Sequence, residues 1–150
     1  MMRRTAPAAL GLVAVLACTR GPPTPAPLDT HNDACASCRM LVSDPRTAAQ
    51  LVAPGEEPLF FDDVGCLARY LAEHPPRQGA VAYVADHRTR TWVPAVSATY
   101  TLQPSASTPM GSHVLAYQDA TSRDADPPAK GGRSLTVRDL FGPARPPEGR

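Results

Sequence analysis

The sequence predicts an α+β domain with a mainly antiparallel sheet. Short apolar runs alternate with turn-forming residues, one segment has helical spacing, and 18 prolines and 10 glycines among 150 residues disfavour long helices. A hydrophobic fraction of 43% supplies the core of one domain. Because 15 basic residues are balanced by 14 acidic ones, the formal charge of +1 excludes a nucleic-acid partner.

The N-terminus is typical of a secretory signal. A basic start precedes an apolar run over 6–17, which is shorter than the roughly 20 residues of a membrane-spanning helix. Residues 15–18, Val-Leu-Ala-Cys, resemble the lipobox of bacterial lipoproteins, so we expect a signal peptide at 1–17 and acylation of Cys18. An ordinary cleaved signal is the alternative. By resemblance to lipoprotein sorting rules, Thr19 favours a periplasm-facing position on the outer membrane.

The remaining chain divides into a linker, a domain and a tail. Residues 18–30 contain four prolines after the cysteine, which favours an extended, semi-rigid spacer. The apolar clusters lie in 31–141, which we predict to be the folded domain. Residues 142–150 are expected to be a disordered tail.

The first half of the domain predicts strand, strand and helix. Two short apolar stretches, 39–42 and 48–52, flank a turn-rich tetrapeptide and are expected to pair as antiparallel strands. Apolar residues at 64, 67, 68 and 71 have the i, i+3, i+4, i+7 spacing of an amphipathic helix, which ends by Pro75. A preceding aspartate can cap this helix.

The second half loosely repeats this order. Strands are predicted at 80–85, in two pieces of 92–100 bent at Pro94, and at 113–117. A weak helix follows, then a mobile loop over 121–133, and 135–141 is either a strand or a short helix.

Sulfur is concentrated just before the first predicted strand. Without Cys18, the odd set of Cys35, Cys38 and Cys66 implies an unpaired thiol, a metal site or an intermolecular bond. Cys35, Cys38 and Met40 place three sulfur atoms within six residues, and thiolate and thioether ligands together select Cu(I). On a strand, Cys38 and Met40 would project to the same face.

Other interpretations of these residues remain open. A lone CxxC in an oxidising compartment is more often a disulfide, and a methionine such as Met40 more often fills a core. Structural zinc is disfavoured because no second pair of Cys or His ligands with suitable spacing follows. A thioredoxin-type site is disfavoured because the motif precedes a β-like run and not a helix.

Further residues are candidates for a metal site. Met110 lies in a Pro-Met-Gly turn, which favours a ligand role, whereas His31 and His113 are either nitrogen ligands or solvated surface residues. Asp62 and Asp63 are either helix-capping residues or groups that hydrogen-bond to metal ligands and orient them. Cys66 is expected to be a buried structural cysteine, with a role at the metal as the alternative.

Several motifs in order resemble the NosL family of copper-binding lipoproteins, which are accessory to nitrous oxide reductase. They are Cys-Arg-Met-Leu-Val at 38–42, Phe-Phe-Asp-Asp-Val-Gly-Cys at 60–66, Tyr-Val-Ala-Asp at 83–86, Trp92 and Thr-Pro-Met-Gly at 108–111. Together they span about 35–118. Arg39 departs from the pattern, because the family commonly has glycine there.

The resemblance implies a non-enzymatic protein that binds one Cu(I) and passes it to the copper centres of nitrous oxide reductase. It also implies docking to the membrane transport complex of the same system, and a fold of two similar ββα units. Carried over by position, Cys38, Met40 and Met110 are the expected ligands, followed by Cys35. The competing functions are a thiol-disulfide oxidoreductase using Cys35 and Cys38, and a passive lipoprotein with a disulfide between them.

Overall fold

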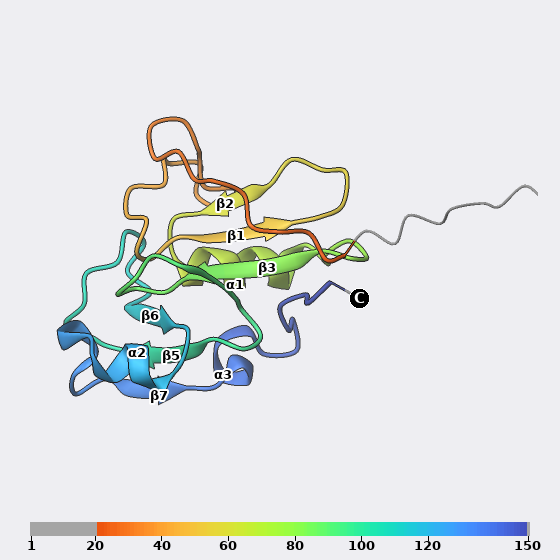
Figure 1. Cartoon of the computed structure of the whole chain (residues 1–150). Helices are drawn as coiled ribbons and strands as arrows, with labels where there is room; N and C mark the ends of the chain where they lie inside the picture. Colours follow the sequence, from red (N-terminus) through yellow and green to blue (C-terminus); the bar gives the residue numbers. More distant parts are fainter. Residues whose placement is uncertain (1–20, 150) are drawn as a thin grey trace, which may run out of the picture.

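A computed structural model describes residues 21–149 as a mixed α+β domain with two antiparallel sheets and three α-helices (Figure 1). The predicted signal peptide, Cys18 and Thr19 lie outside these residues. Within 21–149, no helix combines the length and apolar character that crossing a bilayer requires. The α+β class with antiparallel pairing is therefore confirmed.

The first sheet has the strand order β2-β1-β3-β4, and all its pairs are antiparallel. Its members are β1 (Ala49–Val52), β2 (Leu59–Phe61), β3 (Val81–Ala85) and β4 (Trp92–Pro94). In β1, Ala49 pairs with Phe61 of β2 and with Val84 of β3, whereas Val52 pairs with Val81. One end of the sheet is therefore marked by Ala49 and its partners, and the other end by Val52 and Val81.

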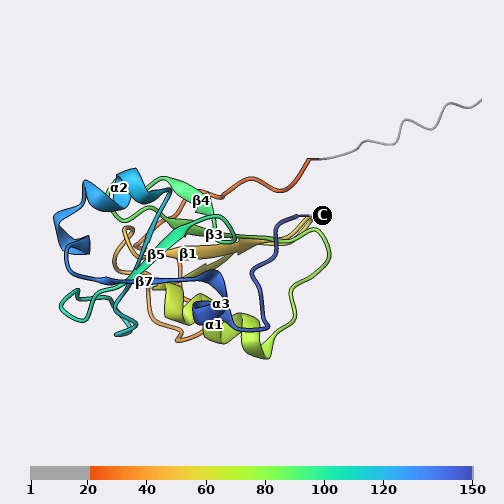
Figure 2. The same ribbon diagram turned by 90° about the horizontal axis from the view of Figure 1, so that it is seen from below.

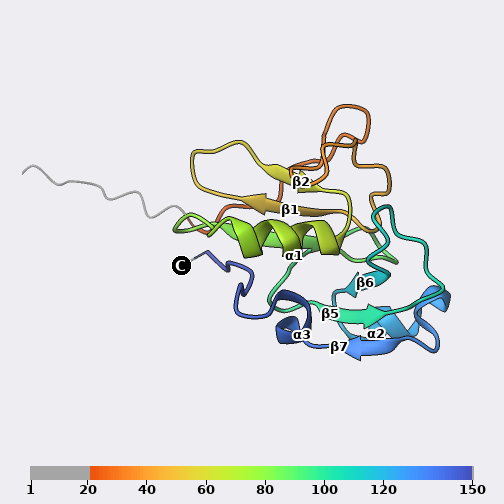
Figure 3. The same ribbon diagram turned by 180° about the vertical axis from the view of Figure 1, so that it is seen from behind.

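Helix α1 (Val64–Glu73) confirms the predicted amphipathic helix and packs against the first sheet (Figure 3). Asp63 caps its N-terminus. The helix ends at Glu73, and His74 is the C-cap, next to Pro75 and Pro76, which cannot continue a helix. Its apolar side chains, including Leu67 and Leu71, are buried in the main core. At about 25 cal/mol per Å² of apolar surface, this face stabilises the contact by several kcal/mol.

The second sheet has the order β6-β5-β7 and lies beside α1 (Figure 2). It consists of β5 (Thr99–Leu102), β6 (Val114–Tyr117) and β7 (Arg133–Leu135). Helix α2 (Ala120–Asp124) and a 3-10 turn (Pro127–Ala129) follow β6, and α3 (Val137–Phe141) follows β7. Phe141 joins the main core, where its ring contacts Tyr100 at a centroid distance of 6.0 Å.

The prediction of a strand at 39–42 is wrong. The backbone φ of Arg39 is +67°, which interrupts an extended chain, and only an isolated bridge joins Ala34 to Leu41. Met40 and Leu41 are each 51% exposed, so no sheet face buries them. The partner of β1 is instead β2, whose three residues the sequence indicated only as the approach to the helix.

The prediction of a mobile loop at 121–133 is also wrong. Asp119 caps α2 by accepting the Ser122 amide, and the buried Asp126 carboxylate accepts the Tyr117 hydroxyl at 2.9 Å. The same Asp126 oxygen lies 2.7 Å from the His87 ring nitrogen Nδ1. These buried contacts order the segment, because an unpaired buried carboxylate would be costly.

Both chain ends of the described region contact the first sheet. The Ala26 amide donates to the Gln50 side chain at 2.8 Å, and the Tyr83 hydroxyl donates to the Pro23 carbonyl at 2.7 Å. The Gly149 amide donates to the Ala80 carbonyl at 2.9 Å. Parts of the expected spacer and tail are therefore packed against the domain.

The two sheets share an arrangement. In the first, β1 pairs antiparallel with β2 and β3, and in the second, β5 pairs antiparallel with β6 and β7. A helix follows β2 in the first sheet and β6 in the second. That they are two copies of one ββα unit stays a prediction.

Arg39 provides a test of the loop conformation. A left-handed backbone costs a non-glycine residue about 1–2 kcal/mol, and glycine avoids this at an entropic cost of about 0.5–1 kcal/mol. We expect Arg39→Gly to raise the free energy of unfolding by about 0.5 kcal/mol. The matched Arg69→Gly, on an exposed position of α1, should lower it by about 1 kcal/mol. Urea unfolding measures both, and a destabilised Arg39→Gly would contradict the loop conformation.

Candidate metal centre

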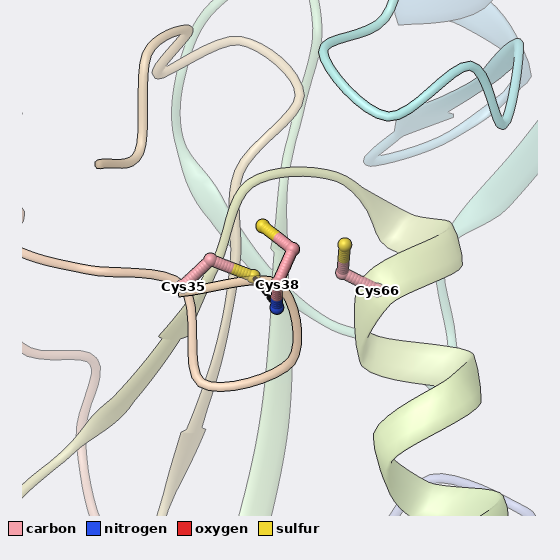
Figure 4. A group of neighbouring side chains, drawn as sticks. All are labelled: Cys35, Cys38 and Cys66. Atoms are coloured by element: carbon pink, nitrogen blue, oxygen red, sulfur yellow. Dashed lines mark hydrogen bonds between the residues drawn. The ribbon is translucent and has the colours of Figure 1, made fainter. Parts of the chain in front are cut away.

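The two cysteines of the CxxC motif and a third from a distant part of the sequence meet at one end of the first sheet. The Sγ atoms of Cys35, Cys38 and Cys66 all lie within 4.8 Å of one another, and none of the three forms a disulfide (Figure 4). Cys35 and Cys66 are buried, whereas Cys38 is partly exposed. With metal–sulfur bonds of about 2.3 Å, a trigonal ion holds its sulfurs about 4 Å apart. Small side-chain adjustments would therefore suffice for one ion.

The CxxC segment forms a tight loop against β2. The Cys35 amide donates to the Met40 carbonyl at 2.8 Å, and the Arg39 amide donates to the Cys35 carbonyl at 2.9 Å. The Ala36 amide donates to the Phe60 carbonyl at 2.8 Å, which fixes the loop to the sheet. The left-handed Arg39 reverses the chain, so the predicted projection of Cys38 and Met40 from one strand face does not apply.

The third thiol comes from the first turn of α1. Gly65, its neighbour, lets the 108–112 turn approach the helix closely, because an ideal Cβ at Gly65 would lie 2.8 Å from the Ser112 Cβ. Since β2 ends at Phe61, the start of α1 lies next to the loop that β2 anchors. Chain topology thus brings Cys66 to the CxxC loop.

Asp63 joins the helix to the Thr-Pro-Met-Gly turn. Its carboxylate is fully buried, and Oδ1 accepts the Cys66 amide at 3.0 Å. Oδ2 accepts the Thr108 hydroxyl at 3.2 Å and the amides of Met110 and Ser112, each at 3.3 Å. The predicted capping role of Asp63 is confirmed. One carboxylate therefore positions the Cys66 turn and the Met110 turn relative to each other.

Asp62 stabilises a different turn. Its Oδ1 accepts the amide and the hydroxyl of Ser43 at 2.9 and 3.2 Å, and its carbonyl accepts the Thr47 hydroxyl. Its Oδ2 is buried and has no hydrogen-bond partner among the residues described. Asp62 is thus not the helix cap, which the sequence left open between the two aspartates.

The electrostatics of Cys35 favour a thiolate. Burial by itself raises the pKa of this thiol, but the backbone N–H groups of Cys38, Asp62 and Ser37 outweigh burial and lower the pKa below its usual value. The Cys38 amide lies 3.5 Å from the Cys35 sulfur. These N–H groups therefore stabilise the thiolate form of Cys35 more than that of an ordinary cysteine.

The other two thiols have the opposite tendency. Burial, followed by the neighbouring Cys35 sulfur, raises the pKa of Cys38. Burial, followed by the negative charges of Cys35 and Asp63, raises the pKa of Cys66. A bound cation would offset these charges, which is how metal binding displaces thiol protons.

The remaining predicted residues have different positions. Met40 is exposed beside the loop, and Met110 is partly buried against the main core. The His31 side chain is 92% exposed next to Asp29, and the His113 Nδ1 lies 2.7 Å from the Ala106 carbonyl oxygen. Within 21–149, neither histidine belongs to the thiol cluster.

Cys66 is the residue whose importance the sequence understated. It is buried, as expected, but it also lies with the two thiols of the CxxC motif. The useful signal was the odd cysteine count combined with a capped helix start directly after a strand. Spacing alone could not indicate that this helix start and the CxxC loop are adjacent.

Comparison with known proteins supports the resemblance noted from the motifs. No curated protein and no solved structure matches the chain. One family model does match: that of NosL, over residues 25–142.

Proposed function

The chain belongs to the NosL family, and from this premise we propose that it binds one Cu(I) and delivers it for assembly of the copper centres of nitrous oxide reductase. The family is linked to that assembly and consists of accessory copper proteins rather than enzymes. The observation that carries the proposal is the meeting of the Cys35, Cys38 and Cys66 sulfurs within 4.8 Å.

The ligand set favours Cu(I) over other metals. Thiolate sulfur is soft and suits Cu(I), which accepts two or three such ligands, whereas Mg²⁺ and Ca²⁺ require oxygen. Structural zinc sites are almost always four-coordinate, and the cluster supplies three thiols. A three-coordinate soft site therefore accounts for both the number and the type of these side chains.

Delivery also needs an exposed edge. Cys35 and Cys66 are buried and Cys38 is only partly so, which leaves Cys38 as the thiol that an acceptor reaches first. Met40, two residues further on, is half exposed, and Met110 is held by Asp63 near the start of α1. We assign the two thioethers to the open side of the ion as alternative weak ligands, either of which an incoming ligand could replace.

An anaerobic Cu(I) titration of the reduced protein, followed by X-ray absorption, tests the proposal. We expect one equivalent of Cu(I) bound by sulfur only. Binding of Zn(II) in preference to Cu(I), or copper coordinated mainly by nitrogen and oxygen, would contradict the assignment.

The two methionines should contribute less than the cysteines. We expect Met40→Leu and Met110→Leu each to weaken Cu(I) binding about 10-fold, because a neutral thioether is a weaker ligand than a thiolate. Competition with a chelator of known affinity measures the change, and unfolding curves should be unchanged. Leu102→Met, which adds a thioether to β5, is the control that leaves affinity unaltered. Wild-type affinity in both leucine variants would limit the site to the three thiols.

A thiol-disulfide oxidoreductase is the second candidate, and the lowered pKa of Cys35 favours it. The complete burial of Cys35 opposes it, because a protein disulfide must reach the attacking sulfur. Reduction of insulin by the wild-type protein, lost in Cys35→Ser, would support this function. The copper function predicts no such turnover.

Location and partners follow from the family and the N-terminal motif. We propose acylation of Cys18 and a periplasm-facing position on the outer membrane, where copper is passed to nitrous oxide reductase through its membrane transport complex. Mass spectrometry of the mature protein, compared with Cys18→Ser, tests the acylation.

We also propose that β1-β2-α1 and β5-β6-α2 are related units. Their shared strand order supports this, as does the capping of both helices by an aspartate that accepts the amide three residues on. That amide belongs to Cys66 in α1 and to Ser122 in α2. On this comparison only the first unit supplies a helical thiol.

A further inference from the structure

The segment between the acylation motif and the domain is fixed along the first sheet. Gln50, which is completely buried, forms two hydrogen bonds with Ala26: it accepts the Ala26 amide at 2.8 Å and donates to the Ala26 carbonyl at 3.2 Å. The Tyr83 hydroxyl donates to the Pro23 carbonyl at 2.7 Å. Gln50 and Tyr83 are register partners, so their side chains share one face of the sheet. Tyr83 packs in a cluster separate from the core that contains α1, so both contacts lie on the face opposite α1.

Pro22 lies at one defined end of this sheet. The Ala82 amide donates to the Pro147 carbonyl, and the Gly149 amide donates to the Ala80 carbonyl. An ideal Cβ on Gly149 would lie 2.9 Å from the Pro22 Cβ, so Pro22 packs directly against the chain at 147–149. The chain therefore enters the domain at the Val81 end of β3.

The thiol cluster lies at the opposite end. Val52 pairs with Val81 at the entry end, whereas Phe61 and Val84 both pair with Ala49 at the other end. Cys66 follows shortly after Phe61, and the loop that bears Cys35 bridges to Phe60. Figure 1 shows the same arrangement, with the 31–42 loop at the end of the sheet away from the C-terminus. At about 3.3 Å per strand residue, the cluster is roughly 15 Å from the entry point.

Little chain separates the entry point from the proposed anchor. Four peptide units lead from Cys18 to Pro22, and they cannot span more than about 14 Å. An acylated Cys18 would thus keep the Pro22 end of the domain close to the lipid headgroups. The prolines at 22–27 do not act as a spacer of their full length, because part of the segment is bound to the sheet.

We propose that the acylated protein is held on the bilayer in one orientation, with the Val81 end of the first sheet toward the lipid and the thiol cluster facing away from the lipid. This inference rests on the proposed acylation of Cys18. The connections at the membrane-facing end include Glu56 and Glu57, and Arg77 is paired with Glu56. Among the described residues, these side chains carry no excess positive charge, so we assign the orientation to the short tether and not to attraction to anionic lipid.

The orientation presents the partly exposed Cys38 and the exposed Met40 to the periplasm. An acceptor could then approach the cluster without displacing the domain from the membrane. A partner that extends well above the bilayer would fit this geometry better than one confined to the lipid surface.

Paramagnetic broadening of amide signals tests the orientation. The acylated, isotope-labelled, copper-free protein is placed in nanodiscs of phosphatidylethanolamine and phosphatidylglycerol that carry a gadolinium-chelating lipid. Since broadening falls with the sixth power of distance, a separation of roughly 15 Å predicts broadening at least about 10-fold stronger at Ala80 and Gly149 than at Cys35 and Cys66. Equal broadening at the two ends, or stronger broadening at the cysteines, would overturn the proposal.

A matched pair of insertions isolates the tether. A long Gly-Ser insertion between Gly21 and Pro22 should make the broadening weaker and more even, whereas the same insertion between the exposed Pro104 and Ser105 should leave the pattern unchanged. If broadening stayed stronger at Ala80 and Gly149 after the insertion in the tether, the tether would not set the orientation and the proposal would be overturned. An unmodified Cys18 would also overturn it, while Cu(I) titration of the same protein tests the proposed function separately.

Discussion

Replacing Cys66 should remove most of the copper affinity while leaving a folded protein. A structural metal site with four ligands contributes about 10–16 kcal/mol, or about 3 kcal/mol per ligand, so loss of one thiolate predicts affinity reduced about 100-fold. We expect this for both Cys66→Ser and Cys66→Ala, because a hydroxyl is a poor ligand for Cu(I). Anaerobic competition with a Cu(I) chelator measures the affinity.

The control for Cys66 is Val64→Ala, another buried position in the first turn of α1. It removes apolar volume and should lower the free energy of unfolding by about 1–3 kcal/mol, with copper affinity unchanged. The two variants therefore separate loss of a ligand from loss of packing. Wild-type affinity in Cys66→Ser would exclude the three-thiol site and leave Cys38, Met40 and Met110 as the ligand set.

The chemistry of the site could be predicted from the sequence, but its full composition could not. Cys35, Cys38 and Met40 are close in the chain and together indicated a sulfur-rich site, whereas the CxxC spacing alone is more typical of a disulfide. The contribution of Cys66 depends on the long-range bridge between Cys35 and Phe60, which places the loop beside the helix that follows β2. No local pattern encodes that contact.

The fold was likewise predictable where its signals are local, and not where it depends on long-range contacts. Helix α1 and strands β3 and β6 were predictable, because apolar spacing and the Asp63 cap are local signals. The strand expected at 39–42 failed because its apolar residues gave no sign of the left-handed Arg39. The docking of 22–30 was hidden for another reason: it depends on long-range contacts of Gln50 and Tyr83, and on Ala26 and Leu28 packing against the main core, which no local pattern indicates.

Arg39 has a backbone conformation that suits the glycine expected from the family resemblance. The resemblance to the NosL family leads us to expect glycine at this position, and the φ of +67° is a conformation that glycine adopts without strain. Arg39 therefore adopts a conformation that suits glycine, at a cost in backbone energy. That cost is tolerated because the loop is held by backbone hydrogen bonds at Cys35 and Ala36.

Asp63 should be the most destabilising single position to change near the site. Its buried carboxylate accepts four hydrogen bonds, and Asp63→Ala would leave four donors without their partner. With buried hydrogen bonds to charged groups at about 1.5–3 kcal/mol each, and with some donors regaining water, we expect a loss of about 3–5 kcal/mol in the free energy of unfolding. Urea unfolding of the copper-free protein measures this loss.

A second substitution separates the two roles of Asp63. Serine is a good helix cap, so Asp63→Ser should keep the bond to the Cys66 amide but lose those to the 108–112 turn, with a destabilisation of about 2–3 kcal/mol. Asp119 is the matched control, because it caps α2 through the Ser122 amide at 2.8 Å. Asp119→Ala should cost about 1 kcal/mol, and Asp119→Ser almost nothing. Should Asp63→Ser be as harmless as Asp119→Ser, the carboxylate would be a cap alone, and the Met110 turn would be held to α1 by packing at Gly65.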